Sequence, residues 1–139
     1  MTMVRIILGI VIGAVLGFGL VVVGDMLNHR FFPPPADVQV TNPEAIRAWM
    51  AEAPILSLLG LPVTWTVAAF AASLVAALIA GRAWAGWIAG GIVFAATCLN
   101  LIMIPHPLWM LIAALVCVPL AGFYGATLVA PRSTEQTPK

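Results

Sequence analysis

The sequence predicts an all-α polytopic membrane protein, a four-transmembrane-helix bundle with a short amphipathic interfacial helix in its first outer loop. Four long apolar stretches carry no charged side chain between their ends. Each stretch reaches the roughly 20 residues that a helix needs to cross a bilayer. The composition agrees, because 63% of the residues are hydrophobic and 8% are charged, whereas about 25% are charged in soluble domains. We therefore expect a single transmembrane domain over residues 1–139.

The first predicted span covers residues 5–25, and the others cover 55–81, 83–104 and 107–131. Small residues recur at four-residue spacing in every span, so that each helix has a face on which another helix can approach closely. These rows serve packing inside the chain, or one of them binds another membrane helix, in a hetero-complex or a homo-oligomer. The residues expected on the packing faces are Gly9, Gly13, Gly17, Gly60, Ala68, Ala72, Ala76, Gly86, Gly90, Ala121 and Gly125.

The outer loop, residues 26–54, is the one sizeable polar segment, and it contains a helix signal. Thr41 or Asn42 can cap a helix over 43–53, with Pro43 at its first position. The apolar residues of this helix share one face. We expect the helix to lie flat on the outer membrane surface.

The basic residues predict the orientation, because short cytoplasmic loops carry the excess of arginine and lysine. Arg5, Arg82 and the tail 132–139 lie on one side of the predicted spans, whereas Arg30 and Arg47 lie in the outer loop among acidic residues. Both termini are therefore expected in the cytoplasm. Tryptophan favours the headgroup region of membranes, and the expected interface anchors are Trp49, Trp84, Trp87 and Trp109.

Polar side chains next to membrane spans are the first candidates for a functional site. The predicted topology brings Asp25, Asn28, His29, Asn100 and His106 to the same outer level. Asp25, His29 and His106 together offer one carboxylate and two imidazoles, a ligand set that suits zinc or another transition metal. The alternative is that these side chains only meet lipid headgroups and satisfy local backbone groups. Asn100 is expected to form a hydrogen bond between helices.

The composition and the spacing of charged residues limit the classes of function that the protein can have. The six basic residues are scattered, which disfavours nucleic-acid binding. No nucleophile, acid/base pair or phosphate loop stands out, and no cofactor is identified; an enzyme with its site at the outer Asp25, His29 and His106 group is the third alternative. Spans without charges are poorly suited to carry ions. The lipid bilayer and other transmembrane helices are the expected partners. We expect a non-enzymatic accessory, structural or assembly subunit; the alternative is a small homo-oligomeric transporter or channel for a neutral or weakly polar substrate.

The segment Ile104-Pro105-His106-Pro107-Leu108-Trp109, which follows Asn28-His29 and the run Pro33 to Pro35, resembles a family of small bacterial inner-membrane proteins without an assigned activity. The resemblance implies a four-helix, multi-pass protein of the bacterial cytoplasmic (inner) membrane. It implies no catalytic or binding residue.

Overall fold

The computed structural model describes residues 2–36, 38 and 41–129, and their secondary structure is helical. The elements are α1 (Thr2–Phe31), α2 (Pro43–Glu52), α3 (Ile55–Ala80), α4 (Ala83–Met103) and α5 (Leu108–Thr127). The four helices other than α2 are each long and apolar enough to cross a membrane. Large apolar side chains cover much of the exposed surface of these helices, as an integral membrane protein requires.

Two helix ends differ from those predicted for the spans. Helix α1 continues through Asp25 to Phe31 instead of ending near residue 25, because no helix breaker occurs before Pro33. Helix α5 ends at Thr127 rather than near residue 131, and the Thr127 hydroxyl donates a 2.9 Å hydrogen bond to the Tyr124 carbonyl there. The predicted tail 132–139 lies outside the described residues.

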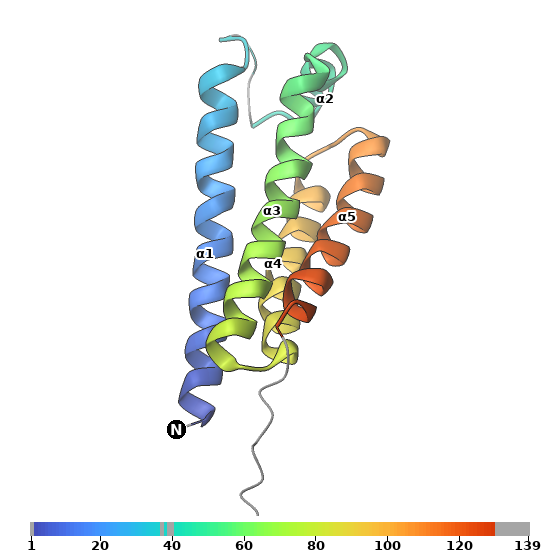
Figure 1. Ribbon diagram of the computed structural model, residues 1–139. Coiled ribbons are helices and arrows are strands. Elements are labelled where there is room, and N and C mark those ends of the chain that lie inside the picture. The colour runs from blue at the N-terminus through green and yellow to red at the C-terminus, as the bar shows by residue number, and fades with distance from the viewer. Residues whose placement is uncertain (1, 37, 39–40, 130–139) are drawn as a thin grey trace, which may run out of the picture.

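Capping residues and a glycine define the helix ends at the turns. Asn42 caps α2 by accepting a 2.9 Å hydrogen bond from the Glu44 backbone N–H, and Pro43 occupies the first turn. Gly81 ends α3 with φ of 67°, a left-handed conformation that glycine adopts without strain. The chain then reverses directly into α4, so that α3 and α4 are joined by a tight turn at the end of the molecule opposite α2 (Figure 1).

Helix α3 is the central element, since it packs against α1, α4 and α5. In Figure 1 it stands between α1 and α5, with α4 behind it. Its buried face consists mainly of alanines such as Ala68, Ala72 and Ala76, which pack with Ala89 and Val93 of α4. Small side chains let the helix backbones approach closely, so dispersion contacts hold the helices together.

The glycines of α1 lie directly against α3. A Cβ atom at Gly9 would come within 2.8 Å of the Ala76 carbonyl oxygen, and one at Gly13 within 2.5 Å of the Ala72 carbonyl oxygen. A Cβ at Gly17 would meet Val93 Cγ2 of α4 at 2.7 Å. The glycine row of α1 is therefore in contact with other helices of the same chain.

Glycines of α4 and α5 also lie in close contact with α3. A Cβ at Gly86 would lie 2.5 Å from the Ser73 carbonyl oxygen, and one at Gly125 would lie 2.5 Å from the Phe70 carbonyl oxygen. Gly90 contacts the Ser73 hydroxyl. Ala121 is only half-buried. At Gly19 and Gly91, by contrast, a Cβ would meet nothing within 4 Å, so these two glycines face outward.

Candidate functional site

The best candidate site is a cavity of about 240 Å³ at the end of the molecule where α2 lies, the top of Figure 1. We call it the polar cavity. It is lined by residues of α1, α2, α3, the end of α4 and the α4–α5 turn. The lining residues are Asp25, Asn28, His29, Pro34, Val38, Ile46, Trp49, Met50, Ser57, Leu58, Leu61, Trp65, Asn100, Ile104 and His106. All five polar residues that the sequence places at the outer level belong to this set.

Helix α1 supplies three of these polar residues because it extends past the predicted end of its span. The His29 Nδ1 atom donates a 2.9 Å hydrogen bond to the Asp25 backbone carbonyl one turn earlier. This bond leaves the Asp25 carboxylate free for other partners. Asn28 packs against α3 at Gly60, where an added Cβ would meet the Asn28 Oδ1 atom at 2.7 Å. The packing role expected for Gly60 is thus to accommodate this polar side chain.

His106 belongs to the turn between α4 and α5. Its Nδ1 atom donates a 2.7 Å hydrogen bond to the Ile104 carbonyl, and its ring meets Trp65 edge to face with centroids 5.8 Å apart. Burial lowers the pKa of His106 below its ordinary value, and the hydrogen bond to Ile104 opposes that shift more weakly. The imidazole is therefore neutral at physiological pH.

Two oxygen atoms in the cavity lining lack hydrogen-bond partners among the described residues. They are Oδ1 of Asp25 and Oδ1 of Asn100, and both are buried. The Asn100 oxygen therefore does not form the interhelical hydrogen bond expected from the sequence. A buried acceptor without a partner costs about 1–3 kcal/mol, and two such acceptors belong to residues that line the polar cavity.

Helix α2 forms the apolar cover of the polar cavity. Ile46, Trp49 and Met50, from its apolar face, line the cavity, and Met50 is 7% exposed. This face was predicted to rest on the outer membrane surface, and three of its residues line the polar cavity in the structure. The amphipathic pattern indicates the apolar face, whereas the cavity beside it has no signal in the local spacing.

The expected tryptophan anchors occupy two kinds of environment. Trp84, Trp87 and Trp109 are exposed on the outside of the helices. Trp49 is half-buried and lines the polar cavity. Sequence reasoning missed Trp65, which is 3% exposed and forms another wall of the cavity. Its position in an apolar span gave no signal beyond core packing.

The metal site considered from the sequence finds no support in the described ranges. Asp25, His29 and His106 all line the polar cavity. Within residues 2–36, 38 and 41–129, however, no group of three or more histidine, cysteine, aspartate or glutamate side chains is placed to hold a metal ion.

A second cavity of about 170 Å³ lies further along the helices and shares Trp65 and Asn100 with the polar cavity. Its other lining residues come from α1 and α4 and include Phe18, Val21 and Val93. It borders the close contacts at Gly17, where an added Cβ would lie 2.7 Å from Val93 Cγ2. The second cavity thus extends the site inward to the tightly packed region of the helices.

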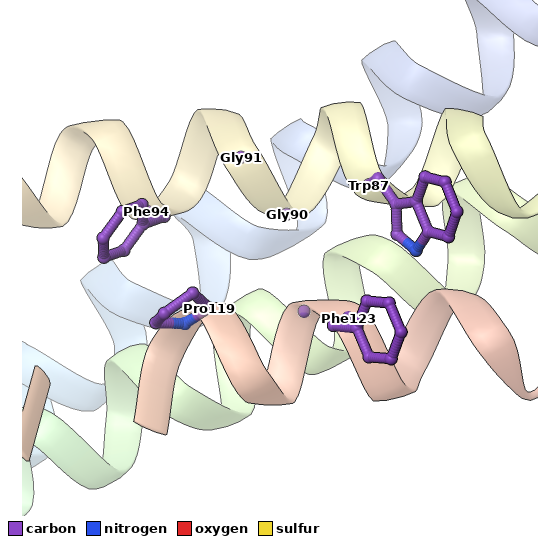
Figure 2. Close-up of a pocket in the computed structure, with 7 residues that line it drawn as sticks. Trp87, Gly90, Gly91, Phe94, Pro119 and Phe123 are labelled. Atoms are coloured by element: carbon purple, nitrogen blue, oxygen red, sulfur yellow. The ribbon is translucent and has the colours of Figure 1, made fainter. Parts of the chain in front are cut away.

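A third space, the α4–α5 groove, differs in character. It has a volume of about 200 Å³ and is lined by glycine, proline and aromatic residues. Figure 2 shows Trp87 and Phe123 side by side at one end of the groove and Phe94 and Pro119 at the other. The rings of Trp87 and Phe123 stack with centroids 5.9 Å apart. No ionisable side chain belongs to this lining, so the groove offers apolar contact without polar recognition.

Neither a protein-family model, nor a curated protein, nor a solved structure matches the chain.

Proposed function

We propose that this chain is an integral membrane protein that binds a small polar molecule in the polar cavity. The observation that supports this function is the pair of buried, unpartnered oxygens of Asp25 and Asn100 at the wall of a space of about 240 Å³. Ligand sites combine mostly apolar walls with a few polar groups that fix orientation. The polar cavity has this composition, and its size suits a ligand smaller than a typical drug.

Binding can be measured by tryptophan fluorescence, because Trp49 and Trp65 line the cavity. The protein in phosphatidylcholine nanodiscs is titrated with 2-phenylethanol, 2-phenylethylammonium and phenylacetate, which share one shape. We expect at least one compound to cause a saturable change that disappears in the Trp49→Phe/Trp65→Phe variant. Signals no greater than the partitioning into empty nanodiscs for all three compounds would refute the proposal.

A second candidate function is passage of the ligand through the membrane, as a small homo-oligomeric transporter or channel. It is favoured by the second cavity, which shares Trp65 and Asn100 with the polar cavity and so continues the site inward. Close helix packing at Gly17 borders the second cavity, so that transport would require these helices to move apart. Transport would produce ligand flux in liposomes that Asn100→Leu abolishes, whereas a binding protein would produce none.

The role of an accessory, structural or assembly subunit has less support. It requires a helix face available to another protein, and the glycine rows that suggested it are in contact with helices of this chain. Gly19 and Gly91 are the outward-facing exceptions among the described glycines. Affinity purification from native membranes in mild detergent tests this role, and a stoichiometric membrane partner would support it.

The expected location is the bacterial cytoplasmic membrane with both termini inside, which puts the polar cavity at the outer face. A single cysteine at position 134, in a Cys98→Ala/Cys117→Ala background, tests the orientation. Both natural cysteines are free, so they must be removed first. A membrane-impermeant maleimide applied to intact cells should leave position 134 unlabelled, and labelling there would reverse the topology.

A further inference from the structure

We propose that the ligand of the polar cavity is a small organic cation, a primary ammonium ion on an aryl or alkyl group, held by the carboxylate of Asp25. This inference rests on the proposed binding function and specifies its ligand class. It follows from the charge, the hydrogen-bonding capacity and the aromatic walls of the cavity, each of which selects against other kinds of ligand.

The charge of the lining favours a cation. Asp25 is the sole acidic residue among the described lining residues, and neither lysine nor arginine is among them. Arg30, which follows His29 in α1, is exposed and does not belong to the lining. His106 is neutral because burial lowers its pKa. An anion would therefore meet the Asp25 carboxylate, with His29 as the other basic side chain of the lining, whereas a cation would neutralise the carboxylate.

The hydrogen-bonding groups of the cavity match an ammonium ion. Oδ1 of Asp25 and Oδ1 of Asn100 are acceptors, and neither has a partner among the described residues. An ammonium group carries three N–H donors and no acceptor. Its three donors are sufficient in number for both oxygens. A hydroxyl group has one donor, and it would leave one of the two acceptors unpaired.

The remaining walls suit the organic part of such a cation. Trp49 and Trp65 line the cavity, and the faces of aromatic rings attract cations. Met50, Leu58 and Leu61 add apolar surface that a bare metal ion could not use. The described residues also provide no cluster of three metal-binding side chains. These walls favour an organic cation over an inorganic one.

The decisive experiment compares 2-phenylethylammonium with 2-phenylethanol, the neutral compound of the same shape, in phosphatidylcholine nanodiscs. Because hydrogen bonds to a charged group are stronger than neutral ones, we expect the ammonium to bind about tenfold to a hundredfold more tightly. Asp25→Asn should remove this preference, so that the ammonium and 2-phenylethanol bind with affinities within about twofold of each other. Retained binding of the alcohol also shows that the variant is folded.

Glu52→Gln is the matched control, because Glu52 is an exposed acidic residue of α2 outside the cavity lining. It should leave the affinities for both compounds unchanged. If 2-phenylethanol or phenylacetate binds at least as tightly as the ammonium, or if Asp25→Asn leaves the ammonium affinity unchanged, the ligand is not a cation held by Asp25. The proposed binding function would then still stand. If none of the three compounds binds saturably, both proposals are wrong.

Discussion

Replacing Gly13 by alanine should destabilise the protein by overpacking the contact between α1 and α3. The new Cβ would lie 2.5 Å from the Ala72 carbonyl oxygen and 2.9 Å from the Ala76 Cβ atom, whereas ordinary contacts begin at 3.4 Å. The carbonyl belongs to the hydrogen-bonded backbone of α3 and cannot rotate away. Helix α1 must therefore retreat by about 0.9 Å, the difference between 3.4 Å and 2.5 Å.

The size of the effect follows from a comparison with Gly19→Ala in the same helix. Both substitutions gain the same helix propensity, about 1 kcal/mol, but a Cβ at Gly19 meets nothing within 4 Å. The difference in unfolding free energy between the two variants therefore isolates the clash. Overpacking of a close contact costs about 1–3 kcal/mol, so we expect Gly13→Ala to be less stable than Gly19→Ala by this amount.

The measurement is reversible unfolding in mixed detergent micelles with increasing dodecyl sulfate, followed by circular dichroism. Equal slopes for the two variants would allow their midpoints to be compared directly as free energies. A Gly13→Ala variant as stable as Gly19→Ala would refute the close packing of α1 on α3, and with it the argument that the glycine row is occupied within the chain.

Three further predictions concern the polar cavity and its cover. Gly60→Ala should displace Asn28 and weaken probe binding about threefold to tenfold in the fluorescence titration, whereas Gly91→Ala, which meets no neighbour, should not. Burial lowers the pKa of His106, so the unfolded chain binds a proton more readily than the folded protein. The free energy of unfolding should therefore fall as the pH drops below about 6.5. Unfolding in micelles at several pH values measures this loss, and His106→Asn should reduce it. Asn42→Ala removes the cap of α2 at a cost of about 1 kcal/mol, and should speed amide hydrogen exchange in α2.

The helix pattern was largely predictable because its signals are local. Spans without charged side chains and the proline at the start of α2 identify helices and several of their ends. The end of α1 was predicted too early, since Asp25 was interpreted as the edge of the membrane. A polar side chain does not break a helix, and α1 continues until the prolines after Phe32. The sequence marks where polarity begins, which is a different boundary from the end of the helix.

The candidate site was predictable in part. The number of predicted membrane crossings places Asp25, His29 and His106 at the same end of the helices. In the structure, all three residues line one cavity. The contribution of Trp65 and the cover formed by α2 could not be predicted. They depend on how each helix is rotated about its axis and on which surface an amphipathic face meets, and neither property is encoded in local spacing.

The cavities lie beside the half of α1 that follows its regular glycine spacing. Gly9, Gly13 and Gly17 lie every four residues and hold α1 close to its neighbours. The next position at this spacing is Val21, which lines the second cavity, and Asn28 and His29 line the polar cavity about two turns later. Close contact with α3 returns at Gly24, where an added Cβ would meet the Thr64 side chain. The cavities therefore lie beside the larger side chains of this half of α1, while Gly24, which lies between Val21 and Asn28 in the sequence, keeps the helix close to α3.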